Sequence, residues 1–177
     1  ENHEYDIIIG TQMISKGFDF PKVTLVGIIN ADESLNIPDF RSAERTFSLL
    51  NQVSGRAGRK DKEGIVLIQC FNTDHYSIID AKNNDYKSFY NEEMKIRKKL
   101  KYPPYYNLCL IKLIGKDYAS INLEMEKIKQ YLLKNDNIIV LGPSVSSIPK
   151  INNKYYIQLI VKYKSLSNIY EEIKFIQ

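Results

Sequence analysis

The chain has 177 residues, of which 44% are hydrophobic and 26% charged, with a formal net charge of +4. This composition is typical of a globular protein with one domain or two small ones. No apolar run approaches the roughly 18 residues of a membrane-spanning helix, so we expect no membrane partner and a cytoplasmic location. Cys70 and Cys109 both fall in predicted strands, and with only His3 and His75 available we assemble no zinc-ligand cluster and expect no metal in this chain.

Three apolar runs in the first half predict strands of a parallel sheet covered on both faces: residues 7–10, 23–30 and 64–70. Between the last two, apolar residues recur at helical spacing after Asp39, which is the expected N-cap of a helix. The order strand, helix, strand predicts an α/β lobe. We expect its ligands to bind at the connections beside the strand and helix ends.

A second helix is expected over residues 85–101 and ends before Tyr102-Pro103-Pro104, because residues that precede proline avoid helical geometry. The domain boundary is placed there, giving domains 1–101 and 102–177. The elements expected beyond it are a strand at 107–114, a helix at 121–132, strands at 138–141 and 155–163, and a helix at 166–176. This order predicts a small α+β ferredoxin-like domain without its last strand. We therefore expect either that the natural protein continues past Gln177 by at least one strand, or that a sheet edge is left uncovered.

Two short segments contain residue types that suit a nucleotide. Residues 52–59 read Gln-Val-Ser-Gly-Arg-Ala-Gly-Arg, in which each arginine follows a glycine. The guanidinium groups of arginine can stabilise negative charge on a transferring phosphoryl group. The alternative interpretation is a surface turn rich in glycine and arginine. Residues 10–21 follow the first apolar run and include Thr11, Gly17 and Asp19. Taken alone, these three residues could also be a helix N-cap and turn residues.

These segments resemble motifs VI and V of superfamily 2 helicases. The segments 38–45 and 101–105 make the chain similar, along essentially its whole length, to the primosomal protein N′ (PriA) family of replication-restart DNA helicases. The resemblance implies part of a RecA-like helicase lobe, a parallel sheet with flanking helices, followed by the C-terminal domain of that family. No phosphate loop and no acidic magnesium-binding box are found in the sequence. We therefore expect a C-terminal fragment that does not hydrolyse ATP by itself.

The resemblance also assigns roles to single residues. Arg56 and Arg59 would stabilise charge on the γ-phosphate of ATP, which is bound with magnesium in the full enzyme. Gln52 would position the nucleotide or couple it to the DNA strand. Gly17 and Asp19 would lie at the nucleotide.

Nucleic-acid contacts are expected at Thr11, Lys98, Lys99, Lys150 and Lys154. The resemblance implies that Thr11 contacts a phosphate of the DNA strand. The two lysine pairs belong to basic stretches at 95–101 and 150–164, which suit a phosphate backbone, the second with tyrosines for base stacking. The alternatives are a solvated helix end that complements the helix dipole and tyrosines that only pack.

For the whole enzyme, the resemblance implies 3′ to 5′ unwinding of forked or single-stranded DNA, in primosome assembly and restart of stalled replication forks. Its implied partners are single-strand-binding protein and other primosome proteins, and its implied zinc site lies outside this chain. Two other interpretations stay open. One is a different superfamily 2 nucleic acid translocase, and the other is a non-catalytic module that binds DNA or a protein.

Overall fold

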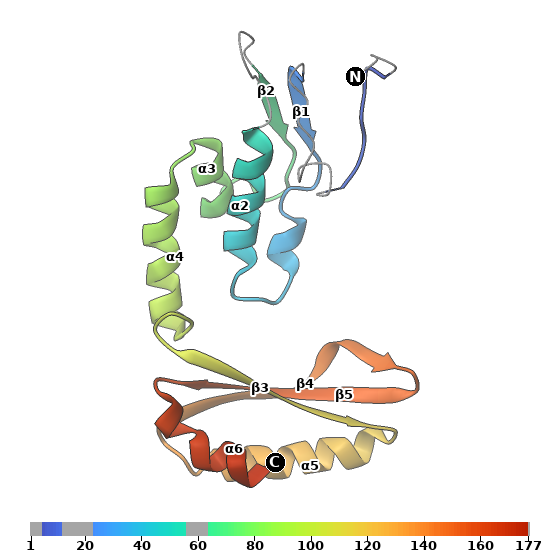
Figure 1. Cartoon of the computed structure of the whole chain (residues 1–177), viewed down its shortest axis with the longest axis vertical. Helices are drawn as coiled ribbons and strands as arrows, with labels where there is room; N and C mark the ends of the chain where they lie inside the picture. The colour runs from blue at the N-terminus through green and yellow to red at the C-terminus, as the bar shows by residue number, and fades with distance from the viewer. Residues whose placement is uncertain (1–4, 12–22, 56–63, 177) are drawn as a thin grey trace. The chain divides into compact units, whose positions relative to one another are not determined.

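The structure is a computed structural model that describes residues 5–11, 23–55 and 64–176. The chain divides into two compact units, Glu1–Lys95 and Ile96–Gln177. A small parallel sheet belongs to the first unit and a separate antiparallel sheet to the second (Figure 1), which is the mixed architecture expected from the sequence. The division lies within a helix, whereas the sequence placed the boundary after that helix, at Lys101.

The first unit is a strand, helix, strand arrangement followed by two more helices. β1 and β2 pair in parallel, with Leu25 opposite Ile65. The elements are β1 (Leu25–Ile28), η1 (Glu33–Asn36), α2 (Ser42–Ser54), β2 (Ile65–Ile68), α3 (Tyr76–Lys82) and α4 (Tyr86–Leu100). The expected helix between the two strands is α2, and the helix expected at 85–101 is α4.

The core of the first unit lies where α2 meets α3 and α4. Phe47 and Leu50 come from the apolar stripe of α2 and are buried, with Ile28 and Ile68 of the strands packed beside them. The ring of Phe47 stacks on that of Phe89 of α4, with 4.1 Å between ring centroids. The helical spacing of the apolar residues therefore predicts the buried face of α2 correctly.

Two expectations about the strands of this unit are wrong. Ile7, Ile8 and Ile9 are exposed and form no strand within residues 5–11, because a short apolar run becomes a strand only where a neighbouring strand pairs with it. Among the described residues, β1 and β2 are covered on one face only. Leu25 and Leu67 are 56% and 58% exposed on the other face.

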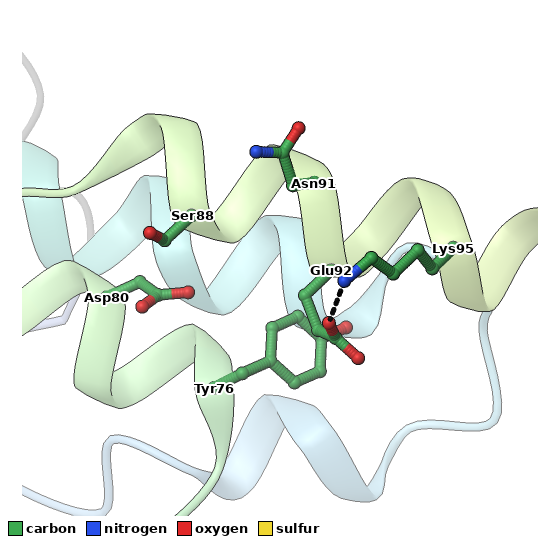
Figure 2. A pocket seen from close by; sticks show the side chains of 6 residues that line it. All are labelled: Tyr76, Asp80, Ser88, Asn91, Glu92 and Lys95. Carbon is green, nitrogen blue, oxygen red and sulfur yellow. Dashed lines mark hydrogen bonds and ion pairs between the residues drawn. The ribbon is translucent and has the colours of Figure 1, made fainter.

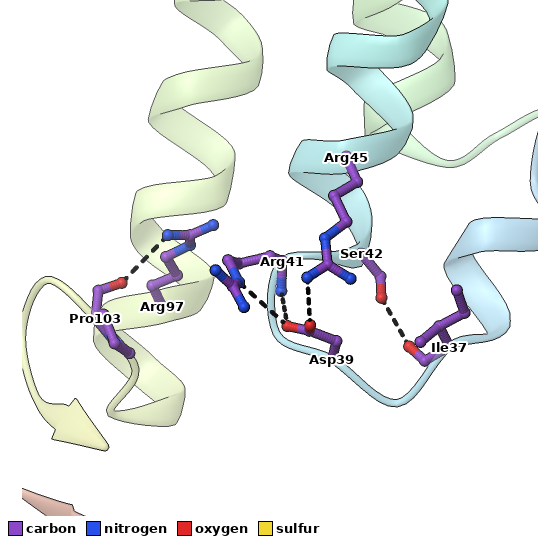
Figure 3. A network of polar contacts seen from close by, with 7 residues as sticks. All are labelled: Ile37, Asp39, Arg41, Ser42, Arg45, Arg97 and Pro103. Carbon is purple, nitrogen blue, oxygen red and sulfur yellow. Dashed lines mark hydrogen bonds and ion pairs between the residues drawn. The ribbon is translucent and has the colours of Figure 1, made fainter. Parts of the chain in front are cut away.

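Asp39 is not the N-cap of α2. The helix begins at Ser42 with Arg41 as its N-cap residue, and no side chain caps it. Figure 3 shows the carboxylate of Asp39 instead accepting a hydrogen bond from the backbone N–H of Arg41 (2.9 Å) and pairing with Arg45 (2.8 Å). Ser42 donates its hydroxyl to the carbonyl of Ile37 (2.7 Å), so the residues before α2 form a turn rather than a helical cap.

The second unit is an antiparallel sheet with two helices on one face (Figure 1). Its elements are β3 (Asn107–Gly115), α5 (Tyr118–Leu132), β4 (Ile138–Ile151), β5 (Lys154–Tyr163), η2 (Leu166–Asn168) and α6 (Tyr170–Ile176). The strand order is β3-β5-β4, so β5 is central. The order strand, helix, strand, strand, helix is the ferredoxin-like α+β order predicted from the sequence.

Alternate residues of β5 form the core of this unit. Ile157, Leu159 and Val161 are buried on the face that meets Met125 and Leu132 of α5. Strict alternation of apolar residues therefore predicts both this strand and its inner face. The stripe of residues at helical spacing predicts α5 in the same way.

β4 is longer than expected. The sequence ended it at Gly142-Pro143, but the strand continues to Ile151 with two irregularities in its pairing. A proline has no backbone N–H to donate, yet an edge strand tolerates it, and β4 is an edge strand here. Asn152 and Asn153 have φ of 48° and 61° and connect β4 to β5 as a tight hairpin turn.

Candidate nucleotide and nucleic-acid sites

The two strands of the parallel sheet begin side by side. The backbone N–H of Ile65 donates to the carbonyl of Thr24 at 2.8 Å. Residues 12–22 lead into β1 and residues 56–63 lead into β2, so both segments join the described structure at the amino-terminal edge of the sheet. Gly17, Asp19, Arg56 and Arg59 belong to these segments and lie outside the described residues.

The sequence places the motifs beside strand and helix ends but does not say at which edge of the sheet they lie. Ligands of open α/β sheets usually bind beyond the carboxyl ends of the strands. Here α2 starts after the carboxyl end of β1 and returns the chain to the start of β2, as the helix of a parallel strand, helix, strand unit must. A motif that directly follows the helix is therefore joined to the amino-terminal edge.

Gln52 and Thr11 are the predicted motif residues that the structure describes. Gln52 is exposed in the last turn of α2, which ends where the N–H of Gly55 donates to the carbonyl of Asn51 at 3.1 Å. Thr11 is exposed and belongs to neither a helix nor a strand. Gln52 lies in the last turn of α2, four positions before Arg56 in the sequence.

The carboxyl ends of the two strands are joined by a buried aspartate that the sequence argument missed. Asp32 is 7% exposed, and its carboxylate accepts hydrogen bonds from the backbone N–H groups of Phe71 (2.9 Å) and Asn72 (2.8 Å). The hydrogen bond from Asn72 holds the pKa of Asp32 below its ordinary value, against the opposing effect of burial. Asp32 therefore fixes the loops beyond β1 and β2.

An open hollow of about 380 Å³ lies between α3 and α4 (Figure 2). Its lining residues are Tyr76, Asp80, Ser88, Asn91, Glu92 and Lys95. The ammonium of Lys95 is paired with Glu92 at 3.3 Å, and burial, with Asp85 and Glu92 nearby, raises the pKa of Asp80. This acidic lining contains no predicted site residue and is unsuited to a triphosphate.

The structure separates the four predicted DNA-binding lysines into two places. Lys98 and Lys99 are exposed in the last turn of α4, while Lys150 and Lys154 are exposed beside the β4–β5 hairpin. β5 has 10 residues, so its two ends lie about 30 Å apart. At the hairpin, the ammonium of Lys150 lies 4.7 Å from the ring centroid of Tyr155, an arrangement that joins a cation to an aromatic face.

Lys162 is also placed differently from the sequence expectation, which grouped it with the surface lysines near the hairpin. It is 5% exposed, and its ammonium donates to the carbonyl of Leu100 at 2.8 Å. The same ammonium lies 3.4 Å from the ring centroid of Tyr102. Lys162 therefore caps the C-terminal end of α4 from the central strand of the second sheet.

Cysteines and acidic groups offer no further site among residues 5–11, 23–55 and 64–176. Cys70 and Cys109 are free and partly buried, and burial raises the pKa of each thiol. No group of three histidine, cysteine or carboxylate side chains in these ranges could hold a metal ion. None of the helices in these ranges has the length and apolar character needed to cross a bilayer.

Comparisons with known proteins match both units. Residues 98–175 match the family described as "Primosomal protein N C-terminal domain", and residues 1–61 match "Helicase conserved C-terminal domain". Replication restart protein PriA of Bacillus subtilis is 51% identical over 161 residues, which is 90% of this chain and 20% of that protein. The PriA proteins of Borreliella burgdorferi and Rickettsia felis are 43% and 39% identical over 94% and 99% of the chain. The chain spans only 20% to 27% of the length of these three relatives.

Proposed function

Because the chain belongs to the family of the replication restart protein PriA, we propose that it forms the arginine-bearing side of an ATP-dependent DNA helicase. The observation that carries this proposal is the paired start of β1 and β2. Gly17 and Asp19 precede β1 in the sequence, Arg56 and Arg59 precede β2, and we infer that both segments reach this edge of the sheet. A nucleotide at that edge could meet both segments at once.

In the proposed enzyme, ATP is bound with magnesium, and its γ-phosphoryl transfer supplies the energy for movement along DNA. Arg56 and Arg59 neutralise the charge that develops on the transferring group, while Gln52, exposed at the end of α2, positions the nucleotide. Gly17 and Asp19 contact the nucleotide beside them. The phosphate loop and the magnesium ligands belong to another lobe, so this chain alone does not turn over ATP.

The uncovered face of the first sheet supports the presence of further structure around it. Leu25, Ile65 and Leu67 are each more than half exposed there, although their strands consist almost wholly of apolar residues. Strands of this composition are usually covered on both faces. A further layer of the proposed motor lobe would cover these side chains.

DNA contacts are proposed on both units. Thr11 holds a phosphate of the tracked strand, and Lys98, Lys99, Lys150 and Lys154 contact the backbone from exposed positions. We infer 3′ to 5′ unwinding at forked or single-stranded DNA in the cytoplasm, during primosome assembly and restart of stalled forks. Single-strand-binding protein and primosome proteins are the proposed partners, and zinc is proposed for another part of the enzyme.

The proposal is tested by measuring DNA-stimulated ATP hydrolysis with the full-length gene product that contains these residues. Arg56→Ala should lower the turnover number about a thousandfold or more, because an arginine that contacts the γ-phosphate contributes at least that factor. DNA affinity, measured by fluorescence anisotropy, should change less than about threefold. The 177-residue chain alone should show no DNA-stimulated turnover.

Arg41→Ala is the matched control. Arg41 lies just before the opposite end of α2, and its side chain is 53% exposed. This variant should keep ATP turnover within about twofold of the wild type. Full turnover by Arg56→Ala, or robust turnover by the 177-residue chain, would contradict the proposed division of the active site between two lobes.

A further inference from the structure

A lysine occupies a backbone position at the end of α4 that normally favours glycine. The N–H of Tyr102 donates to the carbonyl of Arg97 (2.8 Å) and the N–H of Lys101 to that of Lys98 (3.3 Å), the bonding pattern of a Schellman motif. Lys101 has φ of 55°, in the left-handed region. Glycine adopts this conformation without the steric cost of a Cβ. A side chain retained at such a position is reason to look for a function for it.

Near this end of α4, lysine ammonium groups lie over the rings of Tyr102 and Tyr106. The ammonium groups of Lys101 and Lys164 each lie 5.8 Å from the ring centroid of Tyr106. The ammonium of Lys162 lies over the neighbouring ring of Tyr102. Burial, and then the charge of Lys101, lower the pKa of Lys162, so the charges of Lys101 and Lys162 repel each other. We call Lys101, Lys162 and Lys164 the lysine cluster.

No acidic side chain of the described residues pairs with the lysine cluster, unlike three lysines on the surfaces of α4 and α5. Lys95, Lys127 and Lys129 each pair with a glutamate three residues earlier on the same helix. Within the described part of the chain, no ion pair involves a member of the lysine cluster. Concentrated like charge destabilises a folded chain, and a bound anion removes that repulsion. The geometry therefore favours an anionic ligand at the end of α4.

We propose that Lys101 and Lys164, held on Tyr106 and backed by buried Lys162, bind phosphate groups of a nucleic acid backbone. Lysine binds phosphate groups as a point charge. Tyr105, the exposed neighbour of Tyr106 in the sequence, adds an aromatic ring on which a base can stack. This inference rests on the proposed helicase function and adds a site that the lysines at the β4–β5 hairpin do not supply.

The test measures binding of the 177-residue chain to a fluorescein-labelled 25-nucleotide oligo(dT) and to a 25-base-pair duplex, by anisotropy at several salt concentrations. In the double variant Lys101→Gly/Lys164→Gln, the Kd for oligo(dT) should rise roughly 25-fold at about 0.1 M salt, since each lost phosphate contact costs about fivefold there. The slope of log K against log salt should become less negative by about 1.4 for the single strand. A larger loss with one of the two DNAs identifies the form that the cluster prefers.

The matched control is Lys127→Gln/Lys129→Gln, which removes the same net charge from α5. This variant should bind DNA within about threefold of the wild type. Circular dichroism melting should show Lys101→Gly unchanged or more stable than wild type, because glycine suits the left-handed position. Loss of DNA binding then cannot come from unfolding.

Three results would overturn the inference. One is equal loss of affinity in the two double variants, which would reflect net charge alone. Another is wild-type affinity in Lys101→Gly/Lys164→Gln, or no DNA binding by the wild-type chain. The third is loss of binding to a labelled Asp- and Glu-rich peptide with DNA binding intact, which would assign the cluster to an acidic protein. None of these results bears on ATP turnover, so the Arg56→Ala experiment judges the helicase proposal separately.

Discussion

At the scale of single residues, Asp32 is the side chain on which the loops beyond β1 and β2 depend. Its carboxylate accepts two backbone N–H groups from residues some forty positions later in the chain. A charged acceptor makes these hydrogen bonds stronger than a neutral one would. The carboxyl edge of the parallel sheet is therefore held by one ionised group.

This dependence predicts a pH effect on stability. The folded-state pKa of Asp32 is lowered from its ordinary value of 3.8, so its charged form stabilises the fold above that pH, and this stabilisation is lost as the pH falls below it. The denaturation midpoint of Asp32→Asn should lie below that of the wild type at neutral pH, and the difference should shrink below about pH 4. Urea denaturation followed by circular dichroism between about pH 7 and pH 3 measures it.

Asp136→Asn, at an exposed aspartate in the second unit, is the control and should show no such pH-dependent difference. A difference between wild type and Asp32→Asn that stays constant down to about pH 3 would contradict the role of the ionised carboxylate.

Residues that act through tertiary contacts are the ones that sequence reasoning misses. The alternation of β5 puts Lys162 on its outer, polar face, which the sequence alone takes to be solvated. In the structure the end of α4 covers this position, and the carbonyl of Leu100 accepts from its ammonium. The N-cap prediction for Asp39 is wrong because of local contacts. Its residue type suits an N-cap, but its carboxylate instead accepts from the backbone N–H of Arg41 and pairs with Arg45.

At the scale of elements, the close approach of β3 and α5 depends on Gly115. A Cβ at this position would collide with Cγ2 of Ile121, in the first turn of α5. Gly115→Ala should therefore lower the free energy of unfolding by about 1–3 kcal/mol, because the packed helix must shift to admit the methyl group. Urea denaturation of the purified chain measures this loss.

Gly27 of β1 is the matched control, because a Cβ there would meet no atom within 4 Å. Gly27→Ala should change the free energy of unfolding by less than about 0.5 kcal/mol. Equal losses in the two variants would show that the effect comes from the general response of a strand to alanine and not from contact with Ile121.

Elements with strong periodicity could be predicted from the sequence, and those decided by neighbouring strands could not. α2, α4, α5 and β5 follow their helical or alternating patterns closely. β4 extends beyond Gly142-Pro143 because pairing with β5 supports it, a factor that the local sequence does not reveal. α3 is a short helix of 7 residues, below the length at which periodicity is informative.

At the scale of the whole molecule, the uncovered face of the parallel sheet is the feature with the largest consequence for the chain in solution. Leu25, Ile65 and Leu67 form an apolar surface on two adjacent strands. Adjacent exposed apolar side chains promote self-association. In a longer protein with a further layer over this face, the same side chains would belong to the core.

Leu67→Lys should therefore have opposite effects in the two contexts. In the 177-residue chain it should reduce self-association, measured by sedimentation velocity, and change the free energy of unfolding by less than about 0.5 kcal/mol. In the full-length gene product it should lower the free energy of unfolding by several kcal/mol, because a charge would be buried without a partner.

Leu123→Lys provides the comparison, since Leu123 is an exposed leucine on α5 outside this surface. It should leave both proteins unchanged in stability and in association. A neutral effect of Leu67→Lys in the full-length protein would show that no further layer covers the sheet.

The family could be predicted from the sequence, but the edge of the sheet at which the chain enters β1 and β2 could not. The order of residues in 52–59 is a local property, whereas the edge depends on how α2 returns the chain to β2. The roles of Gln52, Arg56 and Arg59 stay predictions. The grouping of lysines around Tyr106 depends on pairing between distant strands, since Asn107 lies opposite Tyr163.

β5 pairs along its length with β3 and, with two irregularities, with β4, and its inner face is closed by α5. Its amide protons are therefore among the last in the second unit to reach solvent, and deuterium should enter the β4–β5 hairpin well before it enters residues 157–162. Lys162 belongs to this slowly opening strand, and its hydrogen bond to the carbonyl of Leu100 connects the end of α4 to it. Partial opening of the hairpin would leave the proposed phosphate-binding end of the domain folded.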